Sequence, residues 1–438
     1  MKLRIKNSLF FLAIVSLLVS TQANSENLLD VFKNSLGSDP QFKSAGAQNR
    51  ASQEQGPQAR ANLLPEASMS ASKLYNSRDV RKSGSLALGT TTFTNNTFSI
   101  DITQPIYRKD LLVNVDQTAV RIRQANAEYA FALQDLIIRV TEGYFEILSA
   151  MDQLEFAISE RDATNQQLTQ SQQRFEVGLI AITDVEEAKA GFDIANAGVI
   201  AAENAVDNAS ETLREITGQY YNSLSRLTPE TPLVKPKPAR MEAWTEIALE
   251  QNLQLRAARE AADVARHGIK LQQAQHHPTL DLVASYTMSQ TGGTSDTETS
   301  VIGLELNLPL FEGGEVISQT RESRFLYQKA LDDLEREQRA AQRAARNAYR
   351  GVVSGISRVQ ALQQAVVSTE AAYEAIQSGF QVGTRTSVDV LNAQRDRFEA
   401  RRDHLQARYD YILEVLRLKQ AAGTLNEDDL VEINNWLE

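Results

Sequence analysis

Apolar residues recur at steps of three and four over two unusually long stretches of the chain. The first stretch spans 111–177, and its apolar positions from Ile137 to Ile158 form a heptad seam. The second stretch spans 316–382 and has the same length and the same kind of pattern. At a rise of about 1.5 Å per residue, each stretch predicts a helix of ~100 Å, which needs packing partners along its length.

A shorter helical pattern follows each long one, at 183–217 and at 386–422, and we expect it to run back along the long helix. The connection carries the same motif, F-x-V-G-x5-D-V-x2-A, in both places. The motif starts at Phe175 and again at Phe380, 205 residues later. Each copy predicts the tip of a helical hairpin, with glycine in the left-handed turn that ends the long helix.

The returning helices cover only about half of their long partners. Two further helical patterns, at 40–62 and at 253–275, are expected to cover the other half. Asp39 and Asn252 stand directly before these patterns and are suitable N-cap residues. The sequence therefore predicts long helices that are covered along most of their length.

The pattern changes to period two in front of each long helix. Apolar and polar residues alternate over 280–288 and 301–308, on either side of a polar loop at 291–299. Weaker alternation occurs at 69–75 and 98–103. Strands of this length with one apolar face fit a transmembrane barrel, and they fit equally an amphipathic hairpin packed on a soluble core.

Four strands cannot close a barrel, since about eight is the smallest number that does. Open strand edges are not tolerated in lipid, because their backbone groups would lack hydrogen-bond partners. If these strands span a membrane, several copies must therefore combine them. Two copies would supply about eight strands and three copies about twelve, and the pattern does not choose between these numbers.

The same order of elements occurs twice, which predicts an internal repeat. Four prolines between Pro229 and Pro238 mark a linker between the two halves. We predict a signal peptide, a first repeat, a Pro-rich linker, a second repeat and a C-terminal equatorial segment at 1–25, 26–225, 226–245, 246–423 and 424–438, respectively.

The first residues have the features of a secretory signal peptide. Lys2, Arg4 and Lys6 precede an apolar run at 9–19, which is too short to span a bilayer. The formal charge of −11 becomes −14 when these three cations are removed (−11 minus 3). So acidic a chain argues against nucleic acid as a partner.

Composition and motifs also limit the chemistry. The chain has no cysteine, which excludes disulfides, cysteine catalysis and a lipid-bearing cysteine. It has no nucleophile–base motif, no phosphate-binding loop and no set of metal ligands. We therefore expect neither an enzyme nor a bound metal or cofactor.

Several motifs together resemble the TolC family of outer-membrane exit ducts. They are the two tip motifs, the proline-flanked strand pairs, Ala407-Arg408-Tyr409 and the run from Ala421 to Asn426. The resemblance extends from about Glu26 to the end. It implies an α+β fold in which four strands and long coiled-coil helices per chain assemble as a trimer. The trimer would form an outer-membrane β-barrel continuous with a helical tunnel across the periplasm.

The family's function is implied in the same way. It is a passive duct for multidrug efflux and type I protein secretion, located in the outer membrane and extending into the periplasm. The expected partners are outer-membrane lipid, a periplasmic adaptor, and an inner-membrane pump or ABC exporter. The alternative is a soluble periplasmic coiled-coil protein with a structural or adaptor role.

The resemblance also assigns a pore gate. Asp389 matches an aspartate that faces the pore axis, and three copies would form a ring of carboxylates that attracts cations. Asn392 stands where family members carry a second aspartate, so we expect one acidic ring, one amide ring and weaker block by metal ions. Asp389 and Thr386 also fit a capping box, which would be a purely structural role.

Links between neighbouring hairpins would hold the gate closed. By resemblance, Arg385 contacts Thr183 and Asp184 of an adjacent hairpin, and Gln167 takes part in a second link. Arginine suits this role because its planar guanidinium matches a carboxylate. Thr183 also fits a capping box, so a structural role stays open. Phe380 replaces a tyrosine of the family, which predicts fewer polar links.

Two further groups of residues are singled out. By resemblance the hairpin tips contact the adaptor through Val177, Gly178, Leu179, Val382, Gly383 and Thr384. A stripe on the second long helix consists of Arg336, Arg339, Arg343, Arg346 and Arg350. Like charges at this spacing repel, so the stripe predicts acidic partners on neighbouring helices, with a lumen-lining role as the alternative.

Overall fold

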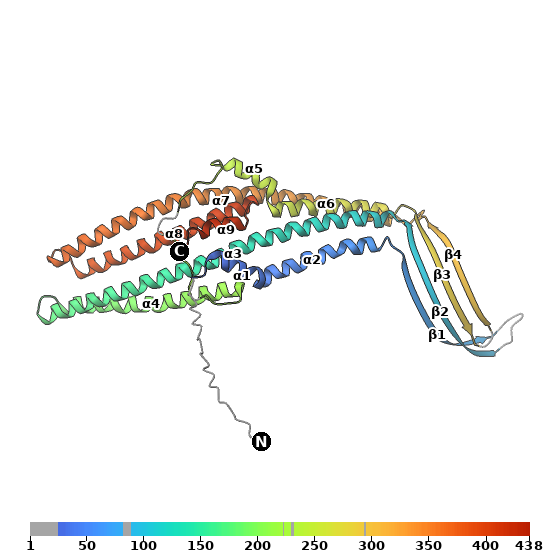
Figure 1. Ribbon diagram of the computed structural model, residues 1–438, viewed down its shortest axis with the longest axis horizontal. Coiled ribbons are helices and arrows are strands. Elements are labelled where there is room, and N and C mark those ends of the chain that lie inside the picture. Colours follow the sequence, from blue (N-terminus) through green and yellow to red (C-terminus); the bar gives the residue numbers. More distant parts are fainter. Residues whose placement is uncertain (1–24, 82–88, 222, 229–231, 293–294) are drawn as a thin grey trace, which may run out of the picture.

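The computed structural model of the chain describes residues 25–81, 89–221, 223–228, 232–292 and 295–438. The expected signal peptide lies outside the described residues, except for its last residue. The described chain is a long rod of helices that carries a bent sheet of strands at one end (Figure 1).

The two long helices and their returning partners form where the sequence predicts them. α3 (Lys109–Glu176) and α4 (Ile182–Thr217) make one hairpin, and α7 (Glu315–Gln381) and α8 (Ser387–Ala422) make the other. The heptad seam of α3 is buried from Ile137 to Ile147, where its apolar side chains pack against neighbouring helices, and is partly buried from Met151 to Ile158. The hairpin tips lie at the end of the rod opposite the strands (Figure 1).

The halves of α3 and α7 near the strands are covered by α2 (Pro40–Ala61) and α6 (Leu253–Ala274). The side chain of Asp39 accepts a hydrogen bond from Phe42 N at 2.7 Å. Asn252 caps α6 in the same way at 2.9 Å. Both predicted N-caps are therefore confirmed.

The strands form one antiparallel sheet in the order β1-β2-β3-β4. Their bounds are β1 (Glu66–Val80), β2 (Gly89–Tyr107), β3 (Thr279–Thr291) and β4 (Ser295–Asn307). The sequence predicts a polar loop at 291–299, and this is wrong, because β3 and β4 remain paired as far as Thr291 and Ser295. Backbone groups make these ladder bonds whatever the polarity of the side chains. Among the described strands, β1 and β4 each have one unpaired edge.

Three short helices were not predicted: α1 (Leu28–Ser38), α5 (Met241–Gln251) and α9 (Glu427–Asn434). They gather at the middle of the rod, where α1 packs on α3 and α5 packs on α7 and α8 (Figure 1). α5 begins inside the range predicted for the linker. Among the described residues, no helix combines the length and the hydropathy of a transmembrane segment.

The main hydrophobic core also lies at the middle of the rod. Phe32, Tyr144 and Tyr411 are among its largest fully buried side chains. Phe145 of α3 stacks on Tyr409 of α8 with ring centroids 5.2 Å apart. Large buried aromatic side chains contribute most to packing, so this region fixes the two hairpins to each other.

The helices form a single layer. Near the strands the neighbours run in the order α2, α3, α6, α7, and near the tips in the order α4, α3, α8, α7. One edge of the layer is therefore α7, and the other edge is α2 followed by α4 (Figure 1). Both edges are open in one chain.

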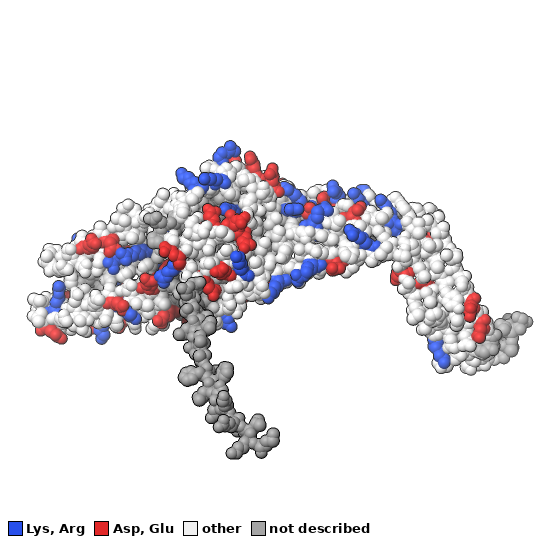
Figure 2. Space-filling model, viewed as in Figure 1, with Lys and Arg blue, Asp and Glu red and all other residues white. Residues whose placement is uncertain are grey.

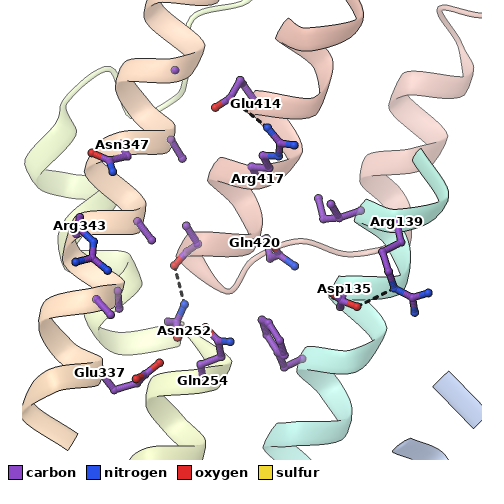
Figure 3. Close-up of a pocket in the computed structure, with 18 of the residues that line it drawn as sticks. Asp135, Arg139, Asn252, Gln254, Glu337, Arg343, Asn347, Glu414, Arg417 and Gln420 are labelled. Carbon is purple, nitrogen blue, oxygen red and sulfur yellow. Dashed lines mark hydrogen bonds and ion pairs between the residues drawn. The ribbon is translucent and has the colours of Figure 1, made fainter. Parts of the chain in front are cut away.

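A groove of about 840 Å³ lies where α3, α6, α7 and α8 meet. Asn252 Nδ2 donates to the Ala421 carbonyl oxygen across it at 3.0 Å, and Arg417 pairs with Glu414 at 3.0 Å (Figure 3). Because most of its charged groups are paired within the chain, the groove is a polar packing junction between α6, on the side of the strands, and α8, on the side of the tips.

Candidate functional site

Each hairpin tip is closed by the same glycine turn. Gly178 and Gly383 have φ values of 78° and 81°, so the predicted left-handed conformation is confirmed. In the first tip, Leu179 N donates to Arg174 O at 2.9 Å and Gly178 N donates to Phe175 O at 2.8 Å. This is the Schellman arrangement, and the second tip repeats it.

The tips present bare apolar side chains to their surroundings. Val177 is 69% exposed, Leu179 is 73% exposed and Val382 is 76% exposed. Gly383 and Thr384 are exposed beside them. Folding of one chain does not bury these apolar side chains, so they are suited to contact a partner.

Asp389, which the resemblance assigns to a pore gate, lies in the first turn of α8. Its carboxylate accepts hydrogen bonds from Thr386 N at 2.9 Å and from the Thr386 hydroxyl at 3.0 Å. These bonds hold the pKa of Asp389 below its usual value, so the side chain stays ionised. The capping box is therefore present, and it leaves the carboxylate charged. Asn392 lies three residues further along the same helix and is exposed.

The first returning helix starts differently from the expectation. Its N-cap is Ala181, so the capping box predicted to begin at Thr183 does not form. Asp184 instead accepts a hydrogen bond from Ala181 N at 3.3 Å. Thr183 and Asp184 thus sit together in the first turn of α4, with the Thr183 side chain exposed.

Arg385 is exposed between the second tip and α8. It forms no ion pair with any described residue of its own chain, and its Cγ lies 2.8 Å from the position of a Cβ built on Gly379. Arg385 and Asp184 are therefore not joined within one chain. A link between them needs a second copy.

A contact that was not predicted joins the two hairpins of one chain. The Arg174 guanidinium lies 4.5 Å from the centroid of the Phe380 ring. Arg174 is in the last turn of α3 and Phe380 is in the last turn of α7. An arginine stacked on an aromatic ring is a stabilising cation–π pair. Phe380 therefore takes part in a link although it has no hydroxyl group.

Gln167 lies in the lower part of α3 and is 8% exposed. Its side-chain nitrogen is buried and has no hydrogen-bond partner among the described residues. The side-chain nitrogen of Gln394 on α8 is in the same state. Buried amide groups normally find a partner, so both residues are available for a further contact.

A single open layer of long hairpins, with a sheet at one end and exposed tips at the other, defines a subunit of a tubular channel. The sequence model of the "Outer membrane efflux protein" family matches residues 31–219 and 244–424. The chain belongs to this family. It is an outer-membrane channel protein, and this membership sets aside the alternative of a soluble periplasmic scaffold.

Individual relatives match over nearly the whole chain. It is 39% identical to outer membrane protein TolC of Vibrio cholerae, covering 96% of both chains. It is 27% identical to the proteases secretion protein PrtF of Dickeya chrysanthemi, covering 98% of this chain and 94% of the relative. The crystal structure of the Campylobacter jejuni CmeC outer membrane channel has the same fold, with a TM-score of 0.81, 15% identity and coverage of 100% and 98%.

Proposed function

We propose that three copies of this chain close into an exit duct that crosses the outer membrane and extends into the periplasm. The observation that carries the proposal is the pair of open edges in one chain. β1 and β4 are the edge strands of the described sheet. In the helix layer, α7 lies at one edge, and α2 and α4 lie at the opposite edge. Because β1 and β4 run antiparallel to each other, β4 of one copy can pair with β1 of the next in the same pattern.

The number of copies follows from the interior that a duct needs. Two copies would give about eight strands, and side chains fill the interior of such a barrel. Three copies give about twelve strands, which leave a passage. The same closure places six hairpins around one axis, two from each copy.

The strand region is suited to lipid. Ile302, Leu304 and Leu306 of β4 follow one another on one face and are 68–77% exposed. The sheet carries few charged side chains on the face visible in Figure 2. An apolar band of this kind is what a membrane-spanning sheet presents to the acyl chains.

The cargo follows from the relatives. The family is described by efflux and a relative is named for protease secretion, which supports a duct for multidrug efflux and for type I secretion. Transport is passive and the chain performs no catalysis, since the energy comes from an inner-membrane pump or ABC exporter. A periplasmic adaptor joins that pump to the duct.

The closed gate is formed at the tips. Three copies bring Asp389 and Asn392 around the axis as one carboxylate ring and one amide ring. Arg385 of one copy pairs with Asp184 and Thr183 of the next, where the guanidinium can bind the carboxylate with two hydrogen bonds. Gln167 supplies a further link through its unpaired buried amide nitrogen.

The adaptor binds the exposed tips. Val177, Gly178 and Leu179 form one contact and Val382, Gly383 and Thr384 form the other. The apolar side chains provide buried area, and the glycines keep the turns narrow. Adaptor binding would pull the hairpins apart and open the gate.

Conductance in planar lipid bilayers tests this function. The purified chain should form a trimer in detergent and a channel of low conductance, and Arg385→Ala should raise the conductance. Arg402→Ala is the control, because the Arg402 guanidinium pairs with Glu399 and Asp403 on its own helix. A monomer without channels would reject the duct, whereas unchanged conductance of Arg385→Ala would reject only the link.

A further inference from the structure

One face of α7 carries five exposed arginines: Arg336, Arg339, Arg343, Arg346 and Arg350. The residues that α7 buries against its own chain at this height are Ala341, Ala345, Ala348 and Val352. At about 100° of rotation per residue, the arginines lie roughly on the opposite side of the helix. Since α7 is an edge of the layer, Arg346 and Arg350 point away from the rest of the chain, whereas Arg343 also lines the groove where α3, α6, α7 and α8 meet.

Arg336 and Arg339, the two arginines nearest the strands, are neutralised by carboxylates of α7. Arg336 pairs with Asp333 at 2.6 Å, and Arg339 pairs with Glu335. These carboxylates belong to α7 itself, at the i,i+3 and i,i+4 spacings of ordinary helix pairs. The expectation of acidic partners on neighbouring helices is therefore wrong for Arg336 and Arg339 within one chain.

The three arginines nearer the tips lack such carboxylate partners among the described residues. Arg343, Arg346 and Arg350 form no ion pair with any described residue. α7 has no carboxylate between Glu337 and Glu370 that could neutralise them. Basic side chains are visible over α6 and α7 between the middle of the rod and the strands (Figure 2). The lower end of the arginine face thus has a net positive charge.

The opposite edge of the layer carries the complementary charge. Asp207, Glu211 and Glu215 are exposed and follow one another along the last turns of α4. They lie opposite the face that α4 buries through Leu213. Glu211 already pairs with Arg214 at 3.0 Å, whereas Asp207 and Glu215 form no ion pair with any described residue.

The two charged faces lie at the same height. The tip glycines place α7 residues level with α3 residues 205 positions earlier, so Arg350 is level with Phe145 and Arg346 is level with Thr141. A Cβ on Gly143 of α3 would lie 3.2 Å from the Leu213 side chain, which aligns position 143 with position 213 on the antiparallel α4. Arg350 is therefore level with Glu211, and Arg346 with Glu215.

We propose that Arg346 and Arg350 form an ionic seam with Glu215, Glu211 and Asp207 of the adjacent copy. The inference rests on the closed ring of the proposed function, which brings α7 of one copy beside α4 of the next. The partner is a second copy of this chain, because its α4 carries the opposite charge at the same level along the rod. The seam sets the vertical register of neighbouring copies at the middle of the rod, above the moving tips.

The absence of native cysteine allows a direct test. Full-length Arg346→Cys/Glu215→Cys protein, purified as a trimer in detergent, should form covalent dimers and trimers with a short bismaleimide crosslinker. Arg336→Cys/Glu215→Cys is the matched control, because position 336 is on the same face but more than two turns above the end of α4. The control should remain monomeric on a denaturing gel.

Charge reversal gives the functional readout. Arg346→Glu/Arg350→Glu and Glu211→Arg/Glu215→Arg should each lower the temperature at which the trimer dissociates, and their combination should restore it. A trimer that neither crosslinks nor responds to reversal would overturn the seam and leave the duct intact. If reversal instead changes only the ion selectivity of the channel, the arginines line the passage and the seam is equally refuted. A parent chain that is monomeric would reject the ring itself.

Discussion

The contact between Arg174 and Phe380 should help to keep the tips together, and removing the ring should open the channel. The guanidinium is 4.5 Å from the ring centroid, well inside the range in which cation–π attraction is significant. Phe380→Leu keeps an apolar side chain of similar reach and deletes the π face. Arg174→Gln keeps much of the length of the arginine side chain and deletes the charge.

The size of the effect can be worked from the structure. Arg174 and Phe380 are both partly exposed, so each contact is worth ~0.5–1 kcal/mol. If three copies open together, removing all three contacts destabilises the closed state by ~1.5–3 kcal/mol in total. Because about 1.4 kcal/mol is a factor of ten, Phe380→Leu should raise the ratio of open to closed channels ~10- to 150-fold.

Single-channel recording in planar bilayers measures that ratio directly. The matched control is Phe175→Leu, because Phe175 occupies the same position of the first tip motif and forms no cation–π pair with any described residue. Phe380→Tyr keeps the ring and should resemble the parent. Two results would refute the reasoning: equal effects of Phe380→Leu and Phe175→Leu, or additive effects of Phe380→Leu and Arg174→Gln, since residues that share one contact should not add.

Three further predictions concern the gate, the tips and the core. Asn392→Asp should add a second acidic ring and strengthen channel block by divalent cations, measured as a lower half-blocking concentration; no change would contradict the amide ring. Gly383→Val should abolish adaptor-dependent efflux while the trimer survives, because a β-branched residue at a φ of 81° is strained by ~1–2 kcal/mol and widens the tip; loss of the trimer would argue for a structural role instead. Tyr409→Phe should destabilise the chain by ~1.5–3 kcal/mol near neutral pH, because it removes the 2.7 Å hydrogen bond to the buried carboxylate of Asp152. Burial raises the pKa of Asp152, so its contribution to stability is full below the ordinary pKa and is lost as pH rises through the folded one. Without the Tyr409 hydroxyl this loss grows, and thermal unfolding at several pH values should show a penalty that shrinks in acid.

Long periodic elements could be read from the sequence because their signals are local and repeated. The bounds of α3 and α7 follow from a continuous heptad pattern and from the glycines that end them. The caps at Asp39 and Asn252 depend on a side chain and a backbone group three residues away. All of these interactions are formed within a few positions of the chain.

The features of the structure that were not predicted, or were predicted wrongly, share a different cause. α1, α5 and α9 are only 11, 11 and 8 residues long, so they carry too few turns for a periodic signal, and they are stabilised by the core at the middle of the rod. The ends of β3 and β4 are polar and are held by pairing with each other. The Arg174–Phe380 contact joins residues 206 positions apart (380 minus 174) and depends on how two hairpins lie side by side. The local pairs of Arg336 and Arg339, by contrast, obey the i,i+3 and i,i+4 rule and could have been predicted.

The distribution of buried residues bears on how the proposed gate at the tips would move. The large fully buried side chains gather at the middle of the rod. Below Asp152, the buried residues of α3 are Thr164, Gln167 and Ser171, and α7 buries no residue from 360 to its end. At this level the apolar burial comes instead from α4 and α8, for example through Val199 and Phe398. The Phe398 ring of α8 lies 6.5 Å from the Phe156 ring of α3, centroid to centroid, and joins the two hairpins. If the tips separate as proposed, we therefore expect the movement to be confined to the part of the hairpins between this aromatic pair and the tips.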